Sequence, residues 1–308
     1  MTQTKQENPL ISIVVITYNS SKYILETLES TIVQTYQNIE LIVSDDCSTD
    51  NTVIICRKWI EENKERFVNT KFITAEHNTG ITANVNRGLL SSKGEWIKFI
   101  SGDDVLLNNC LQRNYDYTIQ EPTANFIFSR IVFFGENNDN FGAKLSYINY
   151  DIFSYSAKQQ YSYLVSKSNV IPAASAFLNK ELLLQLGGFD ERIKLMEDYP
   201  LWIKATKKGN KLYFLDEHTV KYRMHDNAIS QTNPSKAYYK SQYLVFIYYN
   251  LKFLIIRNPF RALDHFIVLK SKYVFSKIIS LFYVLLRFIS PYAYYKFFTI
   301  LFSVNSKK

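Results

Sequence analysis

Cysteine and histidine are both scarce in this chain of 308 residues, which has three cysteines and four histidines. The cysteines, at positions 47, 56 and 110, are odd in number, and no two of them have the C-x-x-C spacing. This pattern argues against a disulfide framework and a structural zinc site, and it favours a reducing compartment. Four histidines also leave little for a metal cage built from histidine alone. Because 47% of the residues are apolar, there is ample material for a core, and disorder is excluded.

Long apolar runs and glycine-rich phosphate loops are missing as well. Residues 1–9 are polar, and the longest uncharged apolar run near the C-terminus, residues 278–286, has nine residues. A membrane-spanning helix needs roughly 18 to 20 such residues, so we expect neither a signal peptide nor a membrane span. The sequence contains neither G-x-G-x-x-G nor G-x-x-x-x-G-K-S/T. If the protein binds phosphate groups, we therefore expect a metal rather than backbone amides to neutralise their charge.

The net charge of +8 is unevenly distributed along the chain. Residues 238–308 contain eleven Lys or Arg, a single acid (Asp264) and 20 of the 48 aromatic residues, whereas residues 1–237 contain 25 bases and 27 acids. A near-neutral body with a basic, aromatic C-terminal part indicates an interfacial appendage. The apolar fraction of this part is too high, and its polar residues are too few, for nucleic-acid binding.

Short apolar runs alternate with segments of helical spacing over the first hundred residues. The runs are rich in β-branched residues and predict buried strands at residues 10–17, 39–44, 71–74 and 95–100. The segments between them predict helices at residues 22–34, 53–63 and 82–91. This alternation predicts an α/β fold built from right-handed βαβ units, with a mostly parallel, doubly wound sheet.

The alternation becomes looser after residue 105. We predict strands at residues 126–134, 211–215 and 220–225, helices at 181–186 and 196–208, and a flexible loop over the site at 137–160. The length of the chain corresponds to one large α/β domain, or to one domain with an appendage.

Polar residues follow three of the predicted strands at their carboxyl ends. The groups are Thr17-Tyr18-Asn19, Asp45-Asp46 and Asp103-Asp104. Ligands bind beyond these ends in doubly wound sheets, so we expect the three groups to converge on one site. Adjacent carboxylates point to opposite sides of the chain, so one of a pair can bind a hard divalent cation while the other accepts a hydrogen bond. The alternative is that each acidic pair caps a turn or a helix.

Three stretches of the sequence resemble the inverting family 2 glycosyltransferases, which have the GT-A fold. They are ISIVVITYNSSKYILETLESTIVQTYQNIELIVSDDCSTDNT, HNTGITANVNRGLLSSKGEWIKFISGDD, and LGGFDERIKLMEDYPLW followed by VKYRMHDNAIS, and they span roughly residues 9–232 in the family's order. The resemblance implies a GT-A (Rossmann-like) fold in which residues 9–106 bind a nucleotide sugar and residues 107–235 bind the acceptor. It does not extend to residues 236–308, which we expect to form a basic, aromatic helical tail.

On the donor side, the resemblance implies that Thr17 and Tyr18 lie against the base of a nucleotide-diphosphate sugar. It also implies that Asp46 accepts a hydrogen bond from an N–H group of that base. Asn84 resembles a position that approaches the donor, with simple surface polarity as the alternative.

The resemblance also implies a divalent cation, Mn²⁺ or Mg²⁺, that bridges the donor diphosphate. Asp104 would coordinate this cation, and Asp103 would lie near the ribose or the cation. His225 would approach the diphosphate or the cation, with a hydrogen-bonded loop histidine as the alternative. Many members carry a further aspartate at the position of Ser101. That departure bears on the expected geometry of the metal site rather than on the presence of a metal.

Glu197 and Asp198 match the Glu-Asp pair of the family. The resemblance implies that Asp198 is the general base, which takes the proton of the acceptor hydroxyl as that hydroxyl attacks the anomeric carbon. Partial burial and the neighbouring Glu197 would raise the pKa of Asp198 toward neutrality. The implied reaction is a single displacement with inversion. The alternative is a helix N-terminus whose acids complement the helix dipole.

The C-terminal tail favours a place at a membrane surface. Single bases among Tyr and Phe on amphipathic helices suit the headgroup region of an anionic leaflet, and a helical subdomain packed on the body is the alternative. Such a tail fits a saccharide acceptor linked to polyprenyl diphosphate, at the cytoplasmic face of the cell membrane. We therefore predict an enzyme that extends a bacterial surface polysaccharide, O-antigen or capsule, from a UDP-sugar.

Three other functions remain as alternatives. A protein- or lipid-glycosylating transferase would have the same fold. A nucleotidyltransferase also places strand-end acids on metal and phosphates, but it would normally show a glycine-rich, basic N-terminal loop. A non-catalytic scaffold has no need of Asp46, Asp104 and Asp198, all of which this chain retains.

Overall fold

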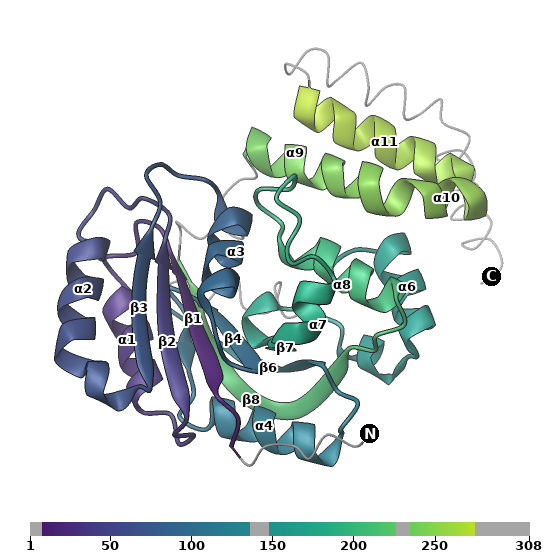
Figure 1. Ribbon diagram of the computed structural model, residues 1–308. Coiled ribbons are helices and arrows are strands. Elements are labelled where there is room, and N and C mark those ends of the chain that lie inside the picture. Colours follow the sequence, from purple (N-terminus) through teal and green to yellow (C-terminus); the bar gives the residue numbers. More distant parts are fainter. Residues whose placement is uncertain (1–7, 136–147, 226–234, 275–308) are drawn as a thin grey trace, which may run out of the picture. The chain divides into compact units, whose positions relative to one another are not determined.

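The computed structural model describes residues 8–135, 148–225 and 235–274, and the chain divides into two compact units (Figure 1). The first unit comprises Met1–Leu164 with Asn169–Gln231, and the second comprises Val165–Ser168 with Thr232–Lys308. Every residue predicted for the catalytic or donor site belongs to the first unit.

A sheet with the strand order β3-β2-β1-β4-β7-β6-β8-β5 forms the centre of the first unit. Its strands are β1 (Ile11–Thr17), β2 (Ile39–Asp45), β3 (Asn69–Thr74), β4 (Trp96–Ser101), β5 (Val105–Leu106), β6 (Phe126–Gly135), β7 (Phe177–Asn179) and β8 (Tyr213–Met224). Its helices are α1 (Ile24–Ile32), α2 (Thr52–Asn63), α3 (Ile81–Ser91), α4 (Cys110–Gln120), α6 (Ala157–Ser166), α7 (Lys180–Gln185) and α8 (Asp198–Lys207). Its 3₁₀ turns are η1 (Lys64–Arg66), η3 (Tyr150–Ser154) and η4 (Ala173–Ser175).

The parallel part of the sheet is the part that the sequence predicts most clearly. Strands β3, β2, β1 and β4 are all parallel to their neighbours. Beyond β4 the sheet is mixed, because β7 pairs antiparallel with both β4 and β6, and β5 pairs antiparallel with β8. The expectation of a mostly parallel sheet therefore holds for the first half of the chain, and the second half completes the sheet with both orientations.

Helices cover both faces of the parallel strands (Figure 1). Ile13 and Val15 of β1 belong to a core that also contains Leu28 of α1. Val14 points to the opposite face, because side chains alternate along a strand. On that face α3 approaches so closely that a Cβ on its Gly88 would lie 2.4 Å from Cγ1 of Val14. The doubly wound arrangement predicted from the sequence is therefore present.

The prediction of two separate strands at residues 211–215 and 220–225 was wrong. A single strand, β8, runs through this region and pairs with β6. The pairing shifts register after Ser129, whose partner is Leu215, because Arg130 pairs with His218. The polar residues Asp216 and Glu217 thus form a bulge within one strand, where the sequence pattern indicated a break between two.

The flexible loop predicted at residues 137–160 was wrong from residue 150 onward, and residues 136–147 lie outside the described part of the chain. Residues 150–154 form η3, and α6 begins at Ala157. Gln160 explains why this polar segment is ordered. Its buried amide donates to the carbonyl of Leu212 at 2.8 Å and accepts from the N–H of Leu212 at 2.9 Å. The side chain of Gln160 thus takes the place of a backbone hydrogen-bonding partner for Leu212, which the polar composition of the segment did not indicate.

The second unit is helical in its described part. It contains α9 (Lys236–Val245), a π-helical turn η5 (Phe246–Asn250), α10 (Leu251–Arg257) and α11 (Pro259–Val274). Phe246, Leu254 and Ala262 form its buried core. Helices are thus present where the tail was expected to be helical, and residues 275–308 lie outside the described part. Among the described residues, no helix has the length and apolar character needed to cross a membrane.

Candidate active site

The strand ends that were predicted to converge lie along one edge of the sheet. Thr17 at the end of β1 is in register with Asp45 at the end of β2, and Ile16 is in register with Ser101 at the end of β4. The turn after β4 passes very close to β1, since a Cβ on Gly102 would lie 2.9 Å from Oγ1 of Thr17. This turn therefore needs a glycine, and it delivers the next two residues, both aspartates, to the same edge.

Asp46 holds the loop that precedes α3. Its Oδ2 accepts hydrogen bonds from the N–H groups of Thr79 and Gly80 at 3.0 and 2.8 Å, and its Oδ1 accepts from the hydroxyl of Thr79 at 2.5 Å. The guanidinium of Arg87 lies 3.3 Å from Oδ1. Asp46 is only 2% exposed, so these protein donors already engage its carboxylate. Its contact with a nucleotide base stays a prediction.

Asn84 is buried and joins α3 to the first two strands, so surface polarity does not explain it. Its amide donates to the carbonyls of Ser44 and Thr17, at 3.0 and 3.3 Å, and its oxygen accepts from the hydroxyl of Ser44 at 2.6 Å. Thr17 is also buried, whereas Tyr18 is 47% exposed. Tyr18 is therefore the more accessible of the two residues predicted to lie against the base.

Asp103 and His225 meet beside the end of β8. Oδ2 of Asp103 lies 2.9 Å from Nε2 of His225, although the residues are far apart in sequence. Asp104 points into the protein and is 3% exposed, and its Oδ1 accepts from the N–H of Arg223 at 2.9 Å. Burial and the neighbouring Asp103 raise the pKa of Asp104, and the bond from Arg223 opposes that rise. Of the two aspartates, Asp103 is the one that the geometry leaves accessible.

Arg223 holds this corner together, which is a role that our sequence analysis did not assign to it. Its Nε donates to the carbonyl of Asp103 at 2.7 Å, and its guanidinium pairs with Glu26 of α1. The guanidinium carbon also lies 4.7 Å from the ring centre of Tyr23 and 4.2 Å from that of Phe134. The ion pair and the two rings fix the turn that carries both aspartates. Because the partners come from separate elements, no local pattern in the sequence indicates this role.

Glu197 and Asp198 stand at the N-terminus of α8. Asp198 is the first residue of the helix, and Glu197 precedes it as the N-cap. Oδ2 of Asp198 accepts from the side-chain amide of Asn169 at 2.6 Å, and Oδ1 accepts from the N–H of Tyr199 at 2.7 Å. The sequence analysis missed Asn169, which lies 29 positions away and follows no motif. Its amide holds the carboxylate in one orientation.

The two carboxyl groups differ in their electrostatic surroundings. Burial, and then the proximity of Asp198, raise the pKa of Glu197 to about 8. Burial also raises the pKa of Asp198, but the hydrogen bonds from Asn169 and Tyr199 oppose that rise. The helix dipole likewise favours a negative charge in the first turn. The hydrogen bonds and the helix N-terminus therefore favour the charged form of Asp198, against the burial that raises its pKa.

The segment that leads to Glu197 lies against the loop that Asp46 holds. The hydroxyl of Thr82 donates to the carbonyl of Ile193 at 2.5 Å. A Cβ on Gly80 would lie 3.3 Å from Cβ of Lys194. The loop held by Asp46 and the segment that precedes Glu197 and Asp198 are thus neighbours, although they come from opposite halves of the domain.

The donor atoms of Asp103 and His225 fit a divalent cation. A carboxylate oxygen and an imidazole nitrogen are ligands that suit Mn²⁺, and substrate phosphates and water commonly supply the rest. Within residues 8–135, 148–225 and 235–274, no group of three or more His, Cys, Asp or Glu side chains could hold a metal ion. The protein alone therefore offers a two-residue set there, and in this structure its two side chains pair with each other.

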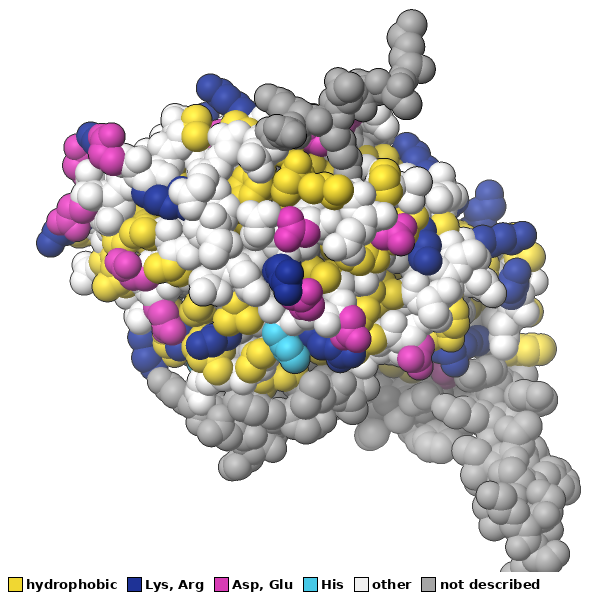
Figure 2. All heavy atoms as spheres, turned by 90° about the horizontal axis from the view of Figure 1, so that it is seen from below, with side chains coloured by type: hydrophobic (Ala, Val, Ile, Leu, Met, Phe, Trp, Pro, Cys, Tyr) yellow, Lys and Arg dark blue, Asp and Glu magenta, His cyan; other side chains and the backbone are white. Residues whose placement is uncertain are grey.

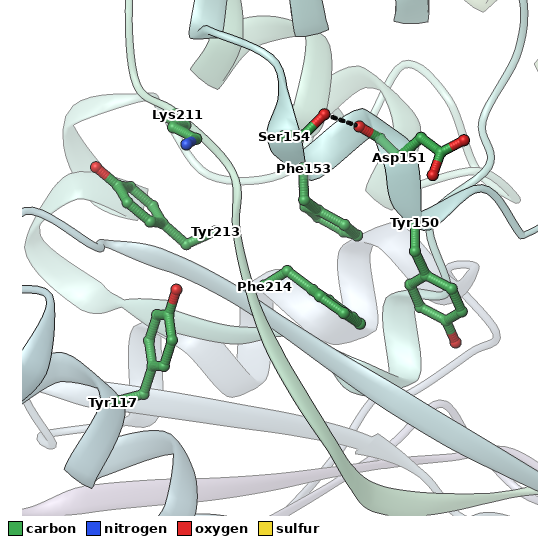
Figure 3. A pocket seen from close by; sticks show the side chains of 8 residues that line it. All are labelled: Tyr117, Tyr150, Asp151, Phe153, Ser154, Lys211, Tyr213 and Phe214. Atoms are coloured by element: carbon green, nitrogen blue, oxygen red, sulfur yellow. Dashed lines mark hydrogen bonds between the residues drawn. The ribbon is translucent and has the colours of Figure 1, made fainter.

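A cavity of about 360 Å³ lies elsewhere in the first unit (Figure 3). Its lining residues are Tyr117, Tyr150, Asp151, Phe153, Ser154, Lys211, Tyr213 and Phe214. Phe153 and Phe214 stack at 5.0 Å between ring centres. The cavity lies at the start of β8, whereas His225 follows the end of that strand. None of the residues predicted for the site lines it.

Comparisons of the fold support the GT-A expectation. The chain is similar to a crystal structure of S. aureus TarS, residues 1–349, in complex with UDP-GlcNAc, with a TM-score of 0.59 and 23% identity over 85% of this chain and 73% of that one. It is also similar to the mannosyltransferase PcManGT from Pyrobaculum calidifontis in complex with GDP-Man and Mn²⁺, with a TM-score of 0.55 and 17% identity over 93% and 76% of the two chains. These likenesses establish the GT-A fold.

Sequence comparisons give the family. The chain is 28% identical to the glycosyltransferase GlyG of Streptococcus pneumoniae, over 72% of this chain and 73% of the relative. It is 26% identical to the putative teichuronic acid biosynthesis glycosyltransferase TuaG of Bacillus subtilis, over 77% of this chain and 87% of the relative. The model of glycosyl transferase family 2 matches residues 12–184, which is more than half of the chain. The protein therefore belongs to glycosyl transferase family 2.

Proposed function

We propose that this glycosyltransferase moves a hexose from a nucleotide-diphosphate donor to a saccharide hydroxyl, with inversion at the anomeric carbon. The observation that carries the proposal is the placement of Asp198. Its carboxyl group accepts a hydrogen bond from Asn169 at a helix N-terminus, beside a Glu197 whose pKa is raised to about 8. A base that is oriented and ionised near neutral pH can remove the proton of an attacking hydroxyl.

The proposed reaction is one displacement. The acceptor oxygen forms a bond to the anomeric carbon while the bond to the diphosphate breaks, and Asp198 takes the acceptor proton. The nucleoside diphosphate leaves with the electrons of the broken bond. No second carboxylate is required as a nucleophile, because the acceptor itself attacks.

On the donor side, we propose that Tyr18 and Thr17 lie against the base and that Asp46 and Asn84 shape that pocket. Asp46 holds the loop at Gly80, and Asn84 fastens α3 beneath the strand ends. The similar TarS and PcManGT structures contain UDP-GlcNAc and GDP-Man, which supports a nucleotide sugar as donor. We favour a UDP-sugar.

We propose that Asp103 and His225 hold a divalent cation, Mn²⁺ or Mg²⁺. When bound, the cation stabilises the negative charge that develops on the leaving diphosphate. A role for Asp104 as a direct ligand has less support, because its carboxylate is buried and accepts from Arg223. The Mn²⁺ in the PcManGT complex is consistent with a cation in this fold.

The proposed acceptor is a saccharide linked to polyprenyl diphosphate, in the synthesis of a bacterial surface polysaccharide such as O-antigen or capsule. The relative TuaG is named for teichuronic acid biosynthesis, which supports a polysaccharide product. We further propose a cytoplasmic enzyme that acts at the inner face of the cell membrane. The basic, aromatic C-terminal region supports a membrane partner.

The proposal predicts that Asp198→Asn abolishes turnover while donor binding is kept. The asparagine preserves the shape of the side chain but cannot accept the proton, so turnover should fall by about 10²- to 10⁴-fold. The measurement is a screen of nucleotide sugars for metal-dependent release of nucleoside diphosphate, with a synthetic diphosphate-lipid acceptor. Calorimetric titration of the donor should give the same affinity for the variant and the wild type.

The matched control is Asp216→Asn, the same chemical change in the exposed bulge of β8. This variant should turn over at the wild-type rate. Full activity of Asp198→Asn would refute the assignment of the base. A wild-type protein that releases no diphosphate from any nucleotide sugar would favour the scaffold alternative.

A further inference from the structure

A sharp corner joins α10 to α11 in the second unit. Asn258 separates the two helices and caps both of them. Its N–H donates to the carbonyl of Leu254 at 2.7 Å, and its side-chain oxygen accepts from the N–H of Arg261 at 3.0 Å. Pro259 occupies the first position of α11, where its fixed φ suits a helix start. The corner is therefore defined by specific bonds and is not a loose connection.

Four large apolar side chains flank this corner and are exposed. Ile255 and Ile256 end α10 with exposures of 52% and 75%, and Phe260 and Leu263 begin α11 with exposures of 51% and 46%. In the rest of the described chain, such residues occur singly along the sequence. Four exposed apolar residues within nine positions mark an interaction surface rather than ordinary surface composition.

The core of the second unit is already formed without these four residues. Leu254, which lies between Phe253 and Ile255 on α10, is buried with Phe246 and Ala262. The exposed isoleucines thus point away from the packed side of their own helix, so they are available to a partner outside this unit.

The charges around the corner are positive. Lys252, Arg257 and Arg261 lie on the same two helix ends, and Arg257 places its guanidinium 4.9 Å from the ring centre of Phe253. Asp264 is buried, and residues 235–274 contain no other acid. Residues 1–237 carry both signs in nearly equal number, and Figure 2 shows acidic and basic side chains interspersed over the face that it presents. A surface with apolar side chains between bases complements an anionic lipid leaflet.

We propose that the α10–α11 corner (Lys252–Leu263) inserts into an anionic bilayer. Ile255, Ile256, Phe260 and Leu263 enter below the headgroups, while the bases contact lipid phosphates. The biological role of this binding rests on the proposed function, because the corner would bring the enzyme to the membrane that carries its lipid-linked acceptor. The binding itself depends only on the corner.

The experiment is sedimentation of the full-length protein with lipid vesicles. The wild type should pellet with vesicles of phosphatidylcholine and phosphatidylglycerol, and much less with phosphatidylcholine alone. Ile256→Glu should weaken partitioning at least about tenfold, because it removes an inserted apolar side chain and adds a negative charge. Arg257→Gln should weaken it about fivefold on anionic vesicles, and have little effect on neutral ones.

Ile54→Glu is the matched control, since Ile54 is 68% exposed on α2 of the first unit. It should bind vesicles like the wild type. If circular dichroism shows that Ile256→Glu is unfolded, Phe260→Ser tests the same surface with a milder change. Equal binding by the wild type and the corner variants would overturn the proposal. A dimer that Ile256→Glu dissociates, without vesicle binding, would assign the surface to a second copy instead.

The same proteins separate this inference from the proposed function. Turnover with a water-soluble acceptor should survive in Ile256→Glu, because the corner does not take part in the chemistry. Vesicle binding without any transferase activity would refute the proposed function and leave this inference standing. Transferase activity without vesicle binding would refute this inference and leave the proposed function standing.

Discussion

Two carboxyl groups are adjacent where α8 begins, and their surroundings act differently on their two pKa values. Glu197 retains its proton because burial and the nearby Asp198 raise its pKa to about 8. Burial raises the pKa of Asp198 as well, and the hydrogen bonds from Asn169 and the backbone oppose that rise. In the proposed mechanism, a protonated Glu197 avoids a second negative charge beside the base.

This arrangement predicts how Glu197 affects stability as pH changes. Between its ordinary pKa of 4.5 and its raised pKa of about 8, the folded protein binds a proton that the unfolded chain has released. The contribution of Glu197 is therefore fully present below pH 4.5 and is lost as the pH rises through about 8. Glu197→Gln cannot titrate at this position and does not lose this contribution. Between pH 5 and 8.5 the free energy of unfolding of the wild type should therefore fall relative to that of Glu197→Gln, by on the order of 2 kcal/mol.

Thermal unfolding of both proteins across that pH range measures the difference. Gln185→Glu, an added carboxyl on α7, controls for a general effect of charge. Parallel curves for the wild type and Glu197→Gln would show that the carboxyl titrates normally.

The positions of single residues were predictable where the signal is local in the sequence. Asp46, Asp103 and Asp198 follow strand ends or begin a helix, and those positions can be read from apolar runs and caps. Asn169 and Arg223 were not predictable, because each acts on a carboxylate or a carbonyl that folding brings from a distant part of the chain. Their chemical type alone gives no indication of a partner.

At the scale of elements, strand β4 carries a lysine that the sequence pattern treats as an ordinary strand residue. Lys98 is fully buried, and its ammonium donates to the carbonyls of Ala174 and Ala176 at 2.6 and 3.2 Å. Burial lowers its pKa. These bonds tie β4, whose end leads to the aspartate pair, to η4 and the start of β7. The lysine therefore stabilises the junction between the two halves of the sheet.

Lys98→Met should destabilise the protein, because two carbonyls lose their donor inside the core. We expect the free energy of unfolding to fall by roughly 2–3 kcal/mol, partly offset because a buried charge is removed. Denaturation in urea measures the change. Lys71→Met on the edge strand β3, where the lysine is exposed, should change stability by less than about 0.5 kcal/mol. Equal effects at the two positions would contradict the role of Lys98.

Elements with strong periodicity were predicted well, and elements fixed by tertiary contacts were not. The first four predicted strands match β1 to β4, because apolar β-branched runs bounded by turns have few alternatives. β8 was divided in two because its bulge is polar, and α6 was missed because Gln160 is ordered by Leu212, 52 positions away. In both cases a partner strand or segment overrides the local pattern.

At the scale of the whole molecule, the two units have separate cores. The larger surrounds the sheet, and the smaller consists of Phe246, Leu254 and Ala262. We therefore expect calorimetry of the full-length protein to show two unfolding transitions. A nucleoside diphosphate with Mn²⁺ should raise only the larger transition, by on the order of 5 °C at a hundredfold excess over Kd. Adenosine is the control, since it lacks the diphosphate. A single transition that shifts as a whole would contradict the independence of the units.

Strand β7 limits the conformational changes that are open to this enzyme and the way its specificity can evolve. It has only three residues, yet it is hydrogen-bonded to β4 on one side and to β6 on the other. One continuous sheet therefore joins both halves of the first unit. The two halves cannot move apart without breaking strand pairs. We therefore expect segments outside the sheet to control substrate entry and product exit. New sugar preferences in this lineage are accordingly expected to arise by replacement of loops, on a frame that stays the same.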